Sequence, residues 1–110
     1  MDFDMNIKER WRDLLEYAKE EKRLDDETGN RICLASFIIN EFGESYKMDK
    51  QKGYFYLKKY GGIDYLNEHW KTLFTEMDNP RNVIRKFFDL CEKNGGNLEL
   101  FIAENNDAEN

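Results

Sequence analysis

The run from Ile32 to Phe42, ICLASFIINEF, constrains the fold more than any other stretch of this 110-residue chain. Glu41 is its only charged residue, and Ser36 and Asn40 are its only other polar residues. A helix that is apolar on most of its faces must be covered by other elements. The run therefore predicts the central helix of a small all-helical domain.

Apolar residues at steps of three and four predict four further helices. Asn79-Pro80 is a strong start signal, because a capping residue precedes proline at the first helical position. Asp49 is a second expected cap, and the pairs Gly61-Gly62 and Gly95-Gly96 are typical helix ends. The expected ranges are about Ile7–Arg23, Arg31–Tyr46, Lys50–Tyr60, Asp64–Thr75 and Pro80–Lys93.

The sequence also predicts the structure of the segments between and after these helices. Gly29 and Asn30 are expected to break the chain before the central helix. Leu98, Leu100 and Ile102 lie at alternate positions, which hints at a short strand without a partner. Residues 105–110 are expected to form a flexible acidic tail. We predict a compact single-domain all-α bundle of about five helices over residues 1–104, followed by this disordered tail.

The same periodicity predicts which side chains face the core. The main stripe of the central helix is expected to be Ile32, Ala35, Ile39 and Phe42, widened by Leu34, Phe37 and Ile38. In the third helix the expected inward residues are Phe55, Leu57 and Tyr60, with Tyr54 and Tyr56 at the edges. In the fifth helix they are Val83, Ile84, Phe87, Phe88 and Cys91.

The net charge of −6 is unevenly distributed. Residues 1–46 carry 7 basic and 12 acidic side chains, residues 47–93 carry 10 and 7, and residues 94–110 carry 0 and 4. Overall acidity argues against a generic binder of nucleic acid or anionic membrane. No apolar run approaches the ~18 residues of a membrane span, and the N-terminus lacks the pattern of a signal peptide. A cytoplasmic protein is expected.

The residue types that carry catalysis are scarce. Cys33 and Cys91 lie in apolar stripes, where thiols are expected to be buried and inert. His69, the only histidine, is expected to pack at the core edge, and its neighbour Glu68 points about 100° away on a helix. One histidine and two distant cysteines give no metal motif, and neither glycine pair is a phosphate loop. We therefore predict no enzyme, no metal site and no cofactor.

Aromatic and basic residues crowd the middle of the chain instead. Tyrosine and tryptophan flanked by lysine are typical of protein-binding hot spots, although packing in the core is the simpler explanation. A helix-turn-helix DNA reader is the alternative, but its reading helix would place Asp64 and Glu68 against phosphate. The predicted contacts with a protein partner are Tyr54, Tyr56, Lys58, Lys59, Tyr65 and Trp70.

Three tracts give the chain a family resemblance: FIINEF, then YLKKYGGIDYLNEHWKTLFT, and the final NGG. Over about residues 33–96 it resembles the small bacterial proteins catalogued as domain of unknown function 3791. The resemblance implies a helical protein without enzymatic activity, often encoded beside a domain similar to ADP-ribosyltransferases. The family commonly has Leu-His-Thr where this chain has Leu73-Phe74-Thr75, so a function that needs that histidine is not expected here.

Together these observations predict a small interaction module. Its partner would be a protein, expected to be the product of a neighbouring gene in an antitoxin-like or defence pair, as the resemblance implies. The family-like part of the domain covers about residues 31–96. Self-association into a homo-oligomer is left open.

Overall fold

The computed structural model describes the backbone of residues 3–20 and 27–109, and every regular element in this part is a helix. The all-α prediction is confirmed, with six helices over the described residues where about five were expected. None of them has the length and apolar content needed to cross a membrane. The helices are α1 (Phe3–Glu20), α2 (Glu27–Ser45), α3 (Lys50–Lys59), α4 (Gly62–Thr75), α5 (Pro80–Lys93) and α6 (Leu98–Glu109).

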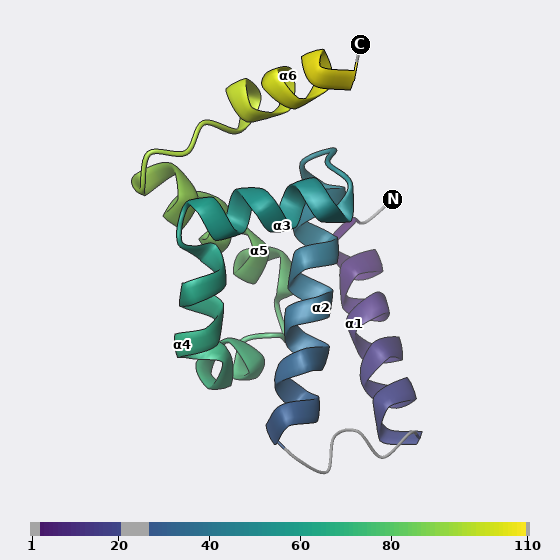
Figure 1. The fold of residues 1–110 in the computed structure, drawn as a ribbon. Coiled ribbons are helices and arrows are strands. Elements are labelled where there is room, and N and C mark those ends of the chain that lie inside the picture. The colour runs from purple at the N-terminus through teal and green to yellow at the C-terminus, as the bar shows by residue number, and fades with distance from the viewer. Residues whose placement is uncertain (1–2, 21–26, 110) are drawn as a thin grey trace.

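Helix α2 is the centre of the bundle, as its composition predicts. It packs against α1, α3, α4 and α5, and Figure 1 shows α1 beside it and α3 across its carboxyl-terminal end. Leu34, Ile38 and Phe42 have no exposed surface. The surrounding helices therefore cover the apolar run of α2.

The predicted orientation of α2 about its own axis was right for Leu34, Phe37, Ile38 and Phe42, which are buried, and wrong for the rest of the expected stripe. Ile32 is 60% exposed, and Ala35 and Ile39 are only partly buried. A helix that is apolar on nearly every face offers little contrast from which to choose the inner one. The buried side contains Cys33, Leu34, Phe37, Ile38, Glu41, Phe42 and Gly43.

Glu41 faces the core because Arg10 of α1 neutralises it. The guanidinium donates from Nε to Oε2 at 2.7 Å and from Nη2 to Oε1 at 2.6 Å. Glu41 is 2% exposed, whereas the Arg10 side chain is 46% exposed. The hydrogen bond to Glu41 is the main cause that raises the pKa of Arg10 above its ordinary value. Paired, hydrogen-bonded geometry is what makes a buried carboxylate tolerable.

Helix α3 crosses α2 at two glycines. A Cβ atom added to Gly53 would lie 3.3 Å from the Cα of Gly43, and one added to Gly43 would lie 3.0 Å from the carbonyl oxygen of Met48. The turn between the helices is tight, with Lys47 at φ 61° and Met48 N–H donating to the Gly43 carbonyl at 2.8 Å. Side chains larger than hydrogen would push the two helices apart.

The predicted helix ends are confirmed where a local signal defines them. The Asp49 carboxylate accepts from Lys52 N–H at 2.8 Å at the start of α3. Pro80 is the first residue of α5, and Asn79 caps it. Gly61 and Gly95 adopt φ 84° and 96°, the left-handed region that closes a helix.

Three expectations about the connecting segments were wrong. Gly29 and Asn30 lie inside α2, which begins at Glu27, so the break precedes them. Residues 98–102 form the start of α6, because Asn97 caps a helix: its side chain accepts from Leu100 N–H at 3.0 Å. The expected flexible tail is helical as far as Glu109. The expected end of the first helix at Arg23 lies outside the described residues.

Replacing Arg10 with alanine is expected to lower the free energy of unfolding by about 2 kcal/mol, because Glu41 would stay buried without its partner. Arg12→Ala, an exposed position on the same helix, is the matched control, with an expected change below about 0.5 kcal/mol. Urea unfolding measures both. Equal, small effects at the two positions would contradict the role given to the ion pair.

Gly43→Ala is expected to destabilise the protein by about 1–2 kcal/mol, because backbone atoms at Met48 and Asp49 leave little room for a methyl group. Alanine is the better helix former by roughly 1 kcal/mol, so the packing loss must exceed that gain. Asn40→Ala, exposed on the same helix, is the control. A rise in the thermal midpoint of Gly43→Ala would refute the close crossing.

Candidate functional site

The predicted partner contacts separate into three environments. Lys58 and Lys59 are exposed on α3, and Tyr54 is half-buried beside them. Tyr65 and Trp70 lie on α4, partly buried against the core. Tyr56 is fully buried. The six residues therefore do not form a single surface.

Helix α3 presents one continuous outward face. Phe55 is 52% exposed and meets the edge of Tyr54, with ring centroids 6.0 Å apart. The Lys58 ammonium lies 6.0 Å from the Tyr54 ring centroid, within cation–π range. Residues three and four apart on a helix are neighbours, so these side chains adjoin one another. We call Tyr54, Phe55, Lys58 and Lys59 the α3 face.

Tyr56 was predicted at the edge of α3 and lies in the core. Its ring contacts Tyr60 at 5.0 Å, Phe101 at 5.1 Å and Phe42 at 6.0 Å between centroids. The inward residues are Gly53, Tyr56 and Leu57, so Phe55 and Tyr56 exchange their predicted positions. Treating Gly53 as a contact residue would have given this stripe, since 53, 56, 57 and 60 follow the helical period.

The Tyr56 hydroxyl is buried without a hydrogen-bond partner among the described residues. Gly96 lies directly against it, since a Cβ there would be 2.6 Å from the oxygen. Burial is the main cause that raises the pKa of Tyr56 to about 12. A side chain in this position serves packing and offers no surface to a partner.

Tyr65 and Trp70 hold α4 against its neighbours. Tyr65 packs edge-on against Phe87 of α5, with ring centroids 5.5 Å apart. Trp70 lies under the ammonium of Lys71 at 5.8 Å, and Lys71 reaches Glu27 at the start of α2, 3.2 Å away. The Tyr65–Phe87 contact joins α4 to α5, whereas the Lys71–Glu27 pair is exposed on both sides and contributes little.

His69 interrupts α4 with non-helical backbone angles, φ −120° and ψ 17°. Its ring packs on Tyr65 with centroids 4.7 Å apart, as a packing histidine would, and its side chain is 50% exposed. Its Nε2 lies 3.8 Å from the Glu68 carboxylate, although adjacent positions on a helix point about 100° apart. Both groups face solvent, where such a pair contributes little.

The two cysteines are buried and free, as expected. Burial raises the pKa of Cys33, and it raises that of Cys91 to about 11. Thiols with raised pKa values are protonated at neutral pH and are weak nucleophiles. Within the described ranges, no three His, Cys, Asp or Glu side chains are grouped to hold a metal ion.

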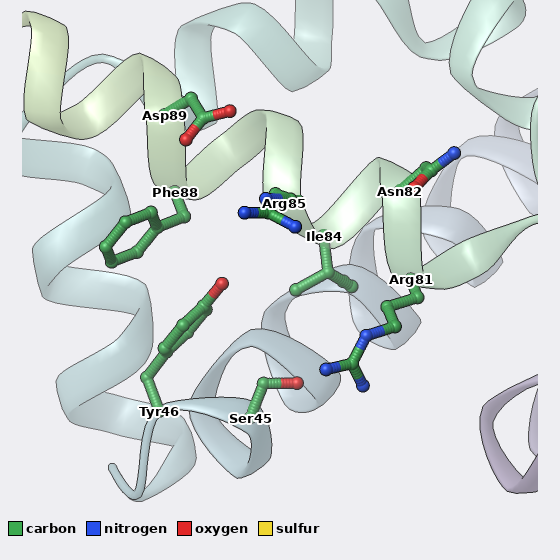
Figure 2. A pocket seen from close by; sticks show the side chains of 8 residues that line it. All are labelled: Ser45, Tyr46, Arg81, Asn82, Ile84, Arg85, Phe88 and Asp89. Carbon is green, nitrogen blue, oxygen red and sulfur yellow. The ribbon is translucent and has the colours of Figure 1, made fainter. Parts of the chain in front are cut away.

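A cavity of about 490 Å³ between the end of α2 and α5 was not predicted (Figure 2). Arg81 and Arg85 contribute guanidiniums from α5, and the Tyr46 and Phe88 rings stack with centroids 4.9 Å apart. The sequence signal that could have indicated this cavity is the spacing of the two arginines, which are one helical turn apart. The lining residues are Ser45, Tyr46, Arg81, Asn82, Ile84, Arg85, Phe88 and Asp89.

Comparisons of this chain with models of protein families, with curated proteins and with solved structures find no match. The resemblance to the domain of unknown function 3791 family stays a prediction.

Tyr56→Phe is expected to raise the free energy of unfolding by up to about 1 kcal/mol at neutral pH, because it removes a buried hydroxyl without a partner. In the unmodified protein, the raised pKa of Tyr56 means that stability falls as pH rises from about 10 towards about 12, since the unfolded chain releases that proton first. Tyr56→Phe has no hydroxyl at this position to titrate, so it is expected to lose less stability than the unmodified protein over this pH range.

Urea unfolding at pH 8 and pH 11 measures both effects. Tyr54→Phe, which removes a hydroxyl from a half-buried residue of the α3 face, is the control. A Tyr56→Phe variant that is less stable at pH 8 would show that the hydroxyl has a bonding partner.

Proposed function

We propose that this protein is a non-enzymatic interaction module that binds a protein partner through the α3 face. The observation that carries the proposal is the exposure of Phe55 beside Tyr54, with Lys58 and Lys59 at its border. Large apolar residues are usually covered, and aromatic side chains with flanking cations are common at interface hot spots. The scarcity of reactive side chains supports the same interpretation.

The charge of this region indicates what kind of surface it binds. Residues 47–93 have a net charge of +3 in a chain of −6, and α3 itself carries Lys50, Lys52, Lys58 and Lys59 without an acidic residue. Complementary charge speeds association and selects among partners. The partner surface would therefore combine an apolar pocket for Phe55 with acidic groups around it.

The proposed partner is the product of a neighbouring gene, a protein similar to ADP-ribosyltransferases, with this chain as its antitoxin-like counterpart. The sequence resemblance over about residues 33–96 supports this identity, and the α3 face supplies a surface suited to it. In such a bacterial toxin–antitoxin or defence pair, this chain would act by binding its partner protein directly.

A DNA-binding regulator is the second candidate, because α3 and α4 are joined by a short turn at Tyr60 and Gly61 and lie at a steep angle in Figure 1. Helix-turn-helix domains share this arrangement. The reading helix would be α4, whose first two turns expose Asp64 and Glu68. Phosphate repulsion at these positions favours the protein partner.

Co-expression with the adjacent gene product, followed by purification, is expected to yield a complex and to rescue growth. Phe55→Ala is expected to weaken the complex by about 2 kcal/mol, roughly 30-fold, if this ring fills a pocket. Lys58→Glu is expected to slow association in a salt-dependent manner. Titration calorimetry and binding kinetics measure the two effects.

Lys8→Glu, an exposed lysine on α1, is the matched control and is expected to leave affinity unchanged. Absence of a complex, or a complex insensitive to Phe55→Ala and Lys58→Glu, would refute the proposed face. A gel shift on the upstream DNA that weakens with salt, without protein binding, would favour the DNA-binding regulator.

A further inference from the structure

We propose that the cavity between α2 and α5 binds a phosphate monoester attached to an apolar group. The site is separate from the α3 face and does not depend on the function proposed for that face. Three features carry the inference: the volume of the cavity, the donors that line one end of it, and the aromatic wall at the other end (Figure 2).

The cavity has the size of a small-molecule or side-chain pocket. Its volume of about 490 Å³ falls in the range of ~300–1,000 Å³ found for ligand sites. Ser45 and Tyr46 contribute one wall, and one side of α5 contributes the other. Inorganic phosphate alone would leave most of this space empty, so the ligand carries a further group.

Two guanidiniums supply the positive charge. Arg81 and Arg85 are four residues apart, which places them on one face of α5 as neighbours. Both are exposed, and no residue in the described part of the chain forms an ion pair with Arg85. The planar donor fork of arginine matches the oxygen geometry of phosphate.

Hydroxyl groups complete the donor set. Figure 2 shows the Ser45 and Tyr46 oxygens directed towards α5. Burial is the main cause that raises the pKa of Tyr46, so its hydroxyl keeps its proton and can donate at neutral pH. A carboxylate has two oxygens, which one guanidinium can satisfy. Two guanidiniums and two hydroxyls suit the three terminal oxygens and double charge of a phosphate monoester.

The opposite end of the cavity is apolar and bears one carboxylate. Phe88 and Tyr46 stack at an interplanar angle of 21°. Ile84, which is 2% exposed, lies between the two arginines in Figure 2. Asp89 lies two turns, about 12 Å, along α5 from Arg81. Asp89 is also one turn, about 6 Å, along α5 from Arg85, so its charge repels phosphate from that end. The phosphate therefore lies on the Arg81 side of Arg85, and the apolar group lies against the rings.

Titration of the full chain with phenyl phosphate, followed by amide chemical shifts, tests the site. Binding is expected to shift the resonances of Ser45, Tyr46 and Arg85, whereas benzoate and inorganic phosphate are each expected to bind at least about tenfold more weakly. Arg85→Gln is expected to weaken phenyl phosphate binding at least about tenfold. Arg31→Gln, about 21 Å away along α2, is the matched control with unchanged binding.

Further probes identify the source of the monoester. A phosphotyrosyl peptide that binds more tightly than phenyl phosphate supports a phosphoprotein ligand, and equal binding supports a free metabolite. Phe55→Ala is expected to leave phenyl phosphate binding unchanged, which separates this site from the α3 face. Absence of these shifts, equal affinity for benzoate, or insensitivity to Arg85→Gln would overturn the proposal. Tighter binding of duplex DNA than of the monoester would also overturn the proposal, because the arginines would then bind the phosphodiesters of DNA.

Discussion

The arrangement of the bundle depends on one buried carboxylate. Glu41 lies on the inner side of α2, where an unpaired charge would cost several kcal/mol of desolvation. Arg10 satisfies both carboxylate oxygens, which requires α1 to lie with that side chain turned towards α2. We infer that this pair selects the orientation of both helices, because the apolar residues of the Ile32–Phe42 run could be buried in several orientations. Ile32 then faces solvent, and Phe42 faces the core.

The composition of the α3 face follows from the glycine crossing that comes next along the chain. Gly43 and Gly53 let α3 approach α2 at close range, which turns Tyr56 and Leu57 inward. Helical geometry then leaves Phe55 and Lys58 on the opposite side. An exposed phenylalanine in α3 is therefore a consequence of how the helix must pack.

Local signals explain why much of the fold could be predicted from the sequence. Asp49, Asn79-Pro80 and the glycine pairs define helix ends through their own backbone and side-chain chemistry, so α3, α4 and α5 were predicted to within two residues at each end. Helices α1 and α2 each begin four residues before their predicted starts. Orientation was harder, because neighbouring Phe55 and Tyr56 are both apolar enough to be buried and only the partner helix decides between them. The α6 helix was missed because the alternate spacing of Leu98, Leu100 and Ile102 favoured a strand, whereas Leu98, Phe101 and Ile102 follow the helical period behind the Asn97 cap. The cavity joins residues some 40 positions apart, which no local pattern contains.

The abundance of aromatic residues, which first indicated an interface, is explained mostly by packing. A row of rings runs through the described core from α5 to α6, with neighbouring centroids 4.9–6.0 Å apart. Its members are Phe88, Tyr46, Phe42, Tyr56 and Phe101. Because Tyr46 is at once a wall of the cavity and a neighbour of Phe42, the cavity is supported by the core. Tyr54 and Phe55 stand outside this row. Packing within the described residues therefore does not account for the exposure of Phe55, and binding by a partner would.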